Sequence, residues 1–149
     1  MTASHVLDTC ALLDLAAGRW TDATARTELQ RAEHPVVLSV SVWEIARKLR
    51  LGKLALPCDQ RGVLDFVRAV CQRHSLHLAP LPAEVCHEAK LLPPHHEDPF
   101  DRMIIAAADA AGAGARRLAA GMEGTGREEN PLAPRAATHK PVPAMEIRP

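Results

Sequence analysis

Short apolar runs alternate with longer segments of helical periodicity through the first 110 residues. The runs 5–8, 36–38 and 76–81 have the length and apolar content of short buried strands, and Pro80 indicates that the third ends early or lies at a sheet edge. Strands that alternate with helices pair in parallel, so the pattern predicts an α/β layered fold with a parallel sheet. In such sheets, functional sites form beyond the carboxyl ends of the strands.

Helix signals fill the segments between these runs. The segment 39–51 carries an apolar stripe and ends before Gly52. The stripe consists of Val42, Ile45, Ala46 and Leu49. Trp43 lies beside the stripe, and the sequence leaves open whether it faces a partner or packs against a neighbouring helix. The segment 103–108 is apolar on every side, which predicts a buried central helix. The expected helices cover residues 9–17, 20–31, 39–51, 59–73, 82–91 and 98–110.

The character of the chain changes after Ala110. Residues 111–121 are almost wholly Ala, Gly, Arg and Leu, with no β-branched residue to build another strand. Residues 121–149 are rich in proline and contain no aromatic residue, which predicts disorder. We therefore expect one domain at residues 1–112 and an atypical segment, disordered or diverged, at residues 113–149.

Composition is that of a chain that folds in water. Hydrophobic residues make up 47% and charged residues 24%, and 18 Lys and Arg balance 18 Asp and Glu, so any contact with nucleic acid must come from a local patch. The sequence shows neither a membrane span nor a signal peptide, and a cytoplasmic protein without membrane contact is expected. Two Phe, two Trp and no Tyr argue against base stacking as the way of gripping single strands.

The four cysteines are scattered along the chain without a C-x-x-C pair. They are Cys10, Cys58, Cys71 and Cys86. This spacing fits neither a zinc knuckle nor a disulfide framework, and reduced structural thiols are expected. A zinc site assembled in space, using Cys71 with His74 or Cys86 with His87, stays open.

Four acids lie at the ends of predicted elements. Asp8 ends the first strand, Glu44 lies in the first turn of a helix, and Asp98 and Asp101 begin the apolar helix. Carboxylates at such positions can converge in space, and an oxygen-rich cluster suits Mg²⁺ or Mn²⁺. Such an ion can activate a water for attack and stabilise the charge that develops on a scissile phosphate.

Each acid also has a structural interpretation, and spacing alone favours it. Asp8 can be the N-cap of the following helix, Ser41 and Glu44 match a capping box, and Asp98 before Pro99 is an N-cap with Asp101 in the favourable first turn. The two interpretations are compatible, because an ionised acid held at a helix start can still face a cation.

Two basic features leave similar alternatives open. His95 and His96 are either metal ligands or proton donors, or a solvated loop pair. The basic positions in 47–53 either hold phosphates near a metal site or form a solvated helix end with a Glu44–Lys48 pair. The chain has no Walker A, G-x-S-x-G, H-E-x-x-H or calcium-loop pattern, so a nucleotide-binding module ranks last.

Four segments occur in an order that carries a family resemblance: VLDTCALL at 6–13, SVSVWEIARK at 39–48, LGKL at 51–54 and HHEDPFDRMIIA at 95–106. Together they resemble the PIN-domain family over about residues 5–112, and within it VapC-type toxins of toxin–antitoxin pairs. The resemblance implies a parallel sheet flanked by helices and an endoribonuclease that uses Mg²⁺ or Mn²⁺ to cleave RNA. It also implies a homodimer and a small cognate antitoxin as partner.

The resemblance also assigns residues to the site. Asp8, Glu44 and Asp101 match the catalytic, metal-binding acids of the family, and Asp98 matches an auxiliary metal-binding acid. Asp8 and Asp101 are expected as direct ligands, whereas Glu44 holds the metal or its water. The residues expected to contact the substrate or support the ligands are Thr9, Ser41, Lys48 and Arg102.

The resemblance fails downstream, where the family usually continues into a short strand, a Thr or Ser closely followed by Asp, and a last helix and strand. Asp109 is the last aspartate of this chain, and the C-terminal strand region looks atypical or missing. A shifted reading frame and a genuinely diverged tail both explain this. The first hypothesis for the function is a ribonuclease toxin. The alternative is a catalytically impaired PIN remnant that binds an antitoxin or a second copy of itself.

Overall fold

The computed structural model describes residues 5–20, 22–94, 97–111 and 116–118, the last of these by backbone alone. The predictions for His95 and His96, and the disorder predicted for residues 121–149, fall outside the described residues.

Four short strands form one parallel sheet in the order β3-β2-β1-β4. They are β1 (His5–Leu7), β2 (Pro35–Leu38), β3 (His77–Ala79) and β4 (Arg116–Leu118). Val6 of β1 is in register with Val36 of β2, and β3 lies at an edge as expected. The predicted α/β fold with a parallel sheet is confirmed.

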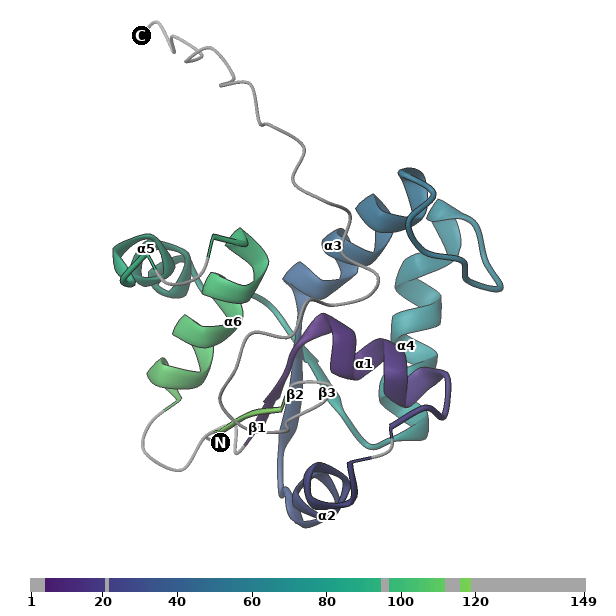
Figure 1. Cartoon of the computed structure of the whole chain (residues 1–149), viewed down its shortest axis with the longest axis horizontal. Coiled ribbons are helices and arrows are strands. Elements are labelled where there is room, and N and C mark those ends of the chain that lie inside the picture. Colours follow the sequence, from purple (N-terminus) through teal and green to yellow (C-terminus); the bar gives the residue numbers. More distant parts are fainter. Residues whose placement is uncertain (1–4, 21, 95–96, 112–115, 119–149) are drawn as a thin grey trace, which may run out of the picture.

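Helices cover both faces of this sheet. They are α1 (Thr9–Ala16), α2 (Ala23–Arg31), α3 (Ser39–Arg50), the 3-10 turn η1 (Gln60–Gly62), α4 (Val63–Arg73), α5 (Ala83–Leu91) and α6 (Pro99–Ala110). In Figure 1, α5 and α6 lie on one side of the strands and α1 and α4 on the other. The same view places the beginnings of α3 and α6 near each other, beyond the strands.

Two apolar clusters hold these layers together. Because successive strand residues point to opposite faces, Leu7 and Val37 enter the cluster under α1, α3 and α4, whereas Val6 and Leu38 enter the cluster under α5 and α6. Ile45 of α3 is fully buried in the first cluster, as its place in the apolar stripe predicts. The sheet therefore packs against both helical layers, one on each face.

Some elements differ from their predicted form. The second helix begins at Ala23 rather than at Trp20, and the segment 59–73 divides into η1 and α4. In the apolar segment 103–108 of α6, Ile104 and residues 106–108 are buried and Met103 and Ile105 are half-buried, so the predicted buried helix is confirmed for most of that segment. Asp109 and Ala110, which follow the segment, are exposed.

The strand β4 corrects the expectation that no strand follows residue 110. Its Arg-Arg-Leu backbone pairs in parallel with β1, so the C-terminal strand region is atypical in composition but present. Strand pairing uses backbone groups, and β propensity is a weak preference that position beside a central strand can override. The boundary predicted between residues 112 and 113 stays a prediction.

None of the helices in the part of the chain that the structure describes is long and apolar enough to span a bilayer.

The fully buried Ile45 gives a test of the core. Ile45→Ala removes apolar contacts that fix α3 on the sheet, and we expect the free energy of unfolding in urea to fall by about 2–5 kcal/mol. Leu91→Ala, at a side chain that is 63% exposed, is the matched control and should stay within about 0.5 kcal/mol of wild type. Equal losses in the two variants would contradict the described core.

Candidate functional site

Two of the four acids are helix caps at the carboxyl side of the sheet. Asp8 directly follows β1, and its Oδ1 accepts a hydrogen bond from the Ala11 backbone N–H at 2.7 Å. Asp98 precedes α6 and accepts from the backbone N–H of Phe100 at 2.8 Å and of Asp101 at 3.4 Å. The capping interpretation is therefore confirmed for both. Asp8 is only 5% exposed, whereas Asp98 is exposed.

Glu44 is not part of a capping box, contrary to the prediction. The strand β2 runs directly into α3, so the helix begins at Ser39 and its N-cap is Leu38, which makes no side-chain cap bond. Ser41 and Glu44 therefore lie within the helix, three residues apart on one face, and Glu44 is beyond the first turn. Both side chains are buried, Glu44 to 6% exposure.

Thr9 connects these two buried groups to α1. Its Oγ1 lies 3.0 Å from Ser41 Oγ and forms a short hydrogen bond with the Glu44 carboxylate. A hydroxyl carries one hydrogen and an ionised carboxylate only accepts, so Thr9 donates to Glu44 and accepts from Ser41. The chain of hydroxyls orients the carboxylate and joins α1 to α3.

Lys48 neutralises the same carboxylate from one turn further along α3. Its Nζ lies 2.6 Å from Glu44 Oε1, which is the i, i+4 pair that the sequence left open. Burial, the largest single influence, lowers the pKa of Lys48, but the hydrogen bond and charge of Glu44 outweigh it and leave that pKa raised. Both Glu44 oxygens are thus engaged, one by Thr9 and one by Lys48.

Cys10 marks the place where the predicted acids converge. Burial raises the pKa of its thiol to about 11, and the charge of Asp8 adds to this, followed by smaller contributions from Glu44 and Asp101, while Lys48 opposes them. Acids from three distant segments therefore lie within electrostatic reach of one side chain. Asp98 also belongs to this neighbourhood, because its charge contributes to the raised pKa of Lys48.

The donor set fits a hard divalent cation by its chemistry. Asp8, Glu44 and Asp101 are carboxylates, which Mg²⁺ and Mn²⁺ prefer. Within the described residues, however, no three His, Cys, Asp or Glu side chains are already gathered closely enough to form a ligand set. The same finding gives the zinc sites considered from the sequence no support in this part of the chain.

The sequence predicted that Arg102 contacts the substrate or supports the ligands, but in the structure its guanidinium is bonded to backbone carbonyls. Its guanidinium donates to the backbone carbonyls at the end of α5: Ala89 at 3.0 Å, Lys90 at 3.2 Å, Leu92 at 2.6 Å and Pro93 at 3.0 Å. These carbonyls have no partner within the helix, so Arg102 caps α5 and fixes α6 against it. The interaction thereby positions the neighbouring Asp101.

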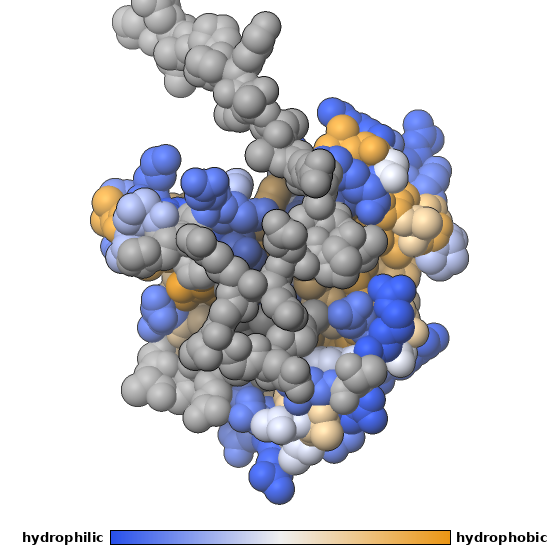
Figure 2. All heavy atoms as spheres, viewed as in Figure 1, coloured by the Kyte–Doolittle hydropathy of each residue, from blue (hydrophilic) through white to orange (hydrophobic). Residues whose placement is uncertain are grey.

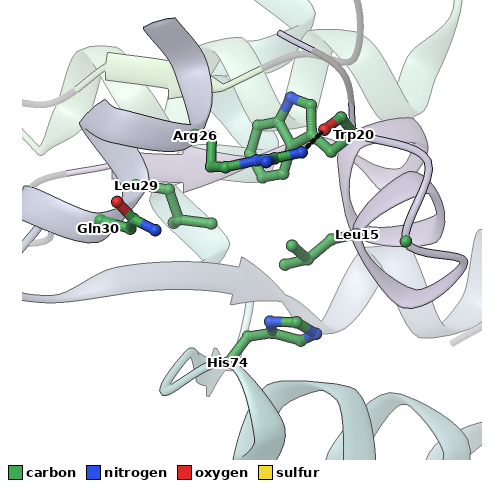
Figure 3. Close-up of a pocket in the computed structure, with 7 residues that line it drawn as sticks. Leu15, Trp20, Arg26, Leu29, Gln30 and His74 are labelled. Atoms are coloured by element: carbon green, nitrogen blue, oxygen red, sulfur yellow. Dashed lines mark hydrogen bonds between the residues drawn. The ribbon is translucent and has the colours of Figure 1, made fainter. Parts of the chain in front are cut away.

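Two cavities lie elsewhere in the molecule. One of about 330 Å³ lies between α1, α2 and the end of α4, where the Arg26 guanidinium donates to the Trp20 carbonyl (Figure 3). The other, of about 430 Å³, is lined mainly by apolar residues of β2, β3, α5 and α6. Neither is lined by a predicted site residue, so the acids lie outside both cavities.

Fold and site together define a parallel α/β domain in which acids follow the central strands β1 and β2 and begin α6. The PIN domain model matches residues 5–115, and the chain belongs to the PIN domain family. PIN domains are generally metal-dependent nucleases. The chain matches no protein of curated description.

The reactivity of Cys10 tests the convergence of the acids. At pH 8 a thiol with a pKa raised from 9.0 to about 11 has roughly a hundredth of the thiolate, so iodoacetamide should alkylate Cys10 far more slowly than the exposed Cys86. Asp101→Asn removes a nearby negative charge and should speed the alkylation of Cys10, as peptide mass mapping would show.

Asp109→Asn is the matched control, since Asp109 lies exposed near the other end of α6. It should leave the alkylation rate of Cys10 unchanged. An equal rate in the Asp101→Asn and wild-type proteins would show that α6 does not bring its first acid to α1.

Proposed function

We propose that this chain is an endoribonuclease that uses Mg²⁺ or Mn²⁺ to cleave RNA phosphodiester bonds and acts as the toxin of a toxin–antitoxin pair. The observation that carries the proposal is that contacts join the segments of the three acids in a chain of the PIN domain family: Thr9, next to Asp8, bonds to Glu44, and Trp43, next to Glu44, packs on Phe100, next to Asp101. Carboxylates that lie near one another repel each other, which lowers the stability of the fold. A bound divalent cation would offset this repulsion.

The environment of each acid supports a distinct role. Asp8, which caps α1 through Oδ1, and Asp101, in the first turn of α6, each lie at the start of a helix, and these two are the proposed direct ligands. Glu44, with both oxygens engaged, is proposed to hold a metal-bound water rather than the ion itself. A divalent ion held at this place would supply a reactive water and would stabilise the charge on the phosphate.

The remaining residues prepare these acids for that role. Lys48 forms an ion pair with the buried Glu44 carboxylate, and Thr9 and Ser41 fix its orientation. Asp98 is exposed and uses Oδ1 for two backbone N–H groups, so we propose it as an auxiliary acid whose negative charge attracts the cation. The proposal therefore keeps the four acids that the family resemblance assigns to the metal site. It places Asp8 and Asp101 in direct contact with the cation and Glu44 and Asp98 in indirect contact.

The biological setting belongs to the same proposal. The segments 6–13, 39–48, 51–54 and 95–106 together resemble VapC-type toxins, and this resemblance supports a small cognate antitoxin and a homodimer as partners. A cytoplasmic location is proposed with them.

The second candidate is a catalytically impaired PIN remnant that binds an antitoxin or itself. Two observations favour it: the described residues contain no closely gathered ligand set, and Asp109 is the last aspartate in the chain. Three carboxylates can still hold one hard cation, more weakly than four. The two candidates therefore differ in whether purified protein cleaves RNA.

Asp8→Asn tests the proposed function. Asparagine caps a helix as well as aspartate does, so the variant should fold, but it removes a ligand charge. We expect cleavage of an RNA pool with Mg²⁺ or Mn²⁺ to fall by at least about a hundredfold, and chelator to abolish it in the wild type. Gel analysis of the fragments measures both effects.

Asp14→Asn provides the control within the same helix, because Asp14 pairs with Arg19 at 3.3 Å and lies outside the acid site. It should cleave like wild type. Undiminished cleavage by Asp8→Asn would refute the metal role, and a folded wild type that cleaves nothing with either ion would favour the impaired remnant.

A further inference from the structure

Trp43 and Phe100 form an aromatic pair between α3 and the start of α6. Their ring centroids lie 5.2 Å apart, with 34° between the ring planes. Aromatic pairs at such distances are favourable, so the contact restrains the indole. Trp43 nevertheless stays 60% exposed. Both interpretations left open by the sequence therefore hold in part: the indole packs against a neighbouring helix and still presents a surface to solvent.

Each residue of this pair is next in sequence to a residue of the acid site or one residue from it. Trp43 directly precedes Glu44, and Phe100 lies between Asp98 and Asp101. The backbone N–H of Phe100 also donates to the Asp98 carboxylate, which fixes the residue at the first turn of α6. Because Trp43 packs on Phe100, a molecule that lies on the exposed indole also lies close to the start of α6, where Asp98 and Asp101 are.

Two cations continue the exposed face of α3 beyond Trp43. Arg47 and Arg50 follow at i+4 and i+7, which places them on the same side of the helix at successive turns, and both are exposed. Within the described residues neither pairs with an acid, whereas the neighbouring Lys48 is bound to Glu44. Figure 2 shows hydrophilic and hydrophobic residues side by side at the upper right of the view, over this end of α3.

We propose that single-stranded RNA binds along this face of α3, with one base stacked on the exposed Trp43 indole and the backbone phosphates held by Arg47 and Arg50. The proposal rests on the proposed ribonuclease function, because it supplies the nucleotides next to the cleaved bond. Aromatic rings stack on any base, and guanidinium groups bind phosphate. A low aromatic content argued against such a platform, but two of the four aromatic residues meet here.

Charge favours a nucleic acid over a protein on this surface. Two like charges on successive turns repel each other, and a polyanion relieves that repulsion. A stacked base next to the carboxylates also explains why the exposed aromatic ring lies at this position of α3. Exposed Trp and Arg are common at protein interfaces as well, so the experiment must separate the two.

The test measures binding of fluorescein-labelled oligouridylate to the full chain by anisotropy, in chelator so that no cleavage occurs. Trp43→Ala should weaken binding about five- to a hundredfold, and Trp43→Phe should restore most of it. RNA should also quench the fluorescence of Trp43, while Trp20 is buried and serves as an internal reference. Leu51→Ala, at an exposed apolar residue just beyond α3, should bind like wild type.

Salt dependence separates the cations from the ring. Arg47→Gln and Arg50→Gln should each reduce the slope of log affinity against log salt concentration by about 0.7, whereas Trp43→Ala should leave that slope unchanged. Circular dichroism confirms that each variant is folded.

Three results would overturn the proposal: no oligouridylate binding by the wild type, wild-type affinity in Trp43→Ala, or a dimer mass that only Trp43→Ala converts to a monomer, which would show a protein interface instead. The test is independent of catalysis. A chain that binds RNA through Trp43 without cleaving it would refute only the nuclease, and undiminished cleavage and binding by Trp43→Ala would refute only this surface.

Discussion

The position of the site depends on one buried carboxylate, that of Glu44. An ionised group with 6% exposure loses most of its hydration, which costs several kcal/mol unless other groups replace the water. Lys48 replaces it with an opposite charge, and Thr9 with a hydroxyl that is itself oriented by Ser41. Because Thr9 belongs to α1 and the other groups belong to α3, satisfying this charge fixes the two helices relative to each other.

That constraint also determines where the other acids lie. Thr9 follows Asp8, so the contact that satisfies Glu44 holds Asp8 beside it at the end of the central strand β1. The third acid is positioned differently: Arg102 binds the carbonyls at the end of α5 and so fixes α6 against α5, and the Trp43–Phe100 pair joins the start of α6, with Asp101, to α3. The convergence around Cys10 is thus the result of two separate sets of polar contacts on a rigid parallel sheet.

Much of this architecture could be predicted from local patterns. Apolar periodicity located β1, β2, β3 and the apolar stripe of α3, and the preference of Asp for helix starts identified the caps at Asp8 and Asp98. The capping box at Ser41 was wrong because the pattern is local, whereas the start of α3 is determined by how β2 enters it. The role of Arg102 could not be predicted, since its partners lie 9–13 residues away on another helix. Likewise, β4 arises from backbone pairing with β1, for which Arg-Arg-Leu gives no side-chain signal.

The most direct test of the central claim, that this network and these acids form a cation site, is anomalous diffraction from crystals of the protein soaked in Mn²⁺. We predict one manganese peak, in contact with the carboxylates of Asp8 and Asp101, with Glu44 still paired to Lys48 and reaching the ion through a water. A manganese peak bound elsewhere, or fully soaked crystals with no peak between Asp8 and Asp101, would contradict the account.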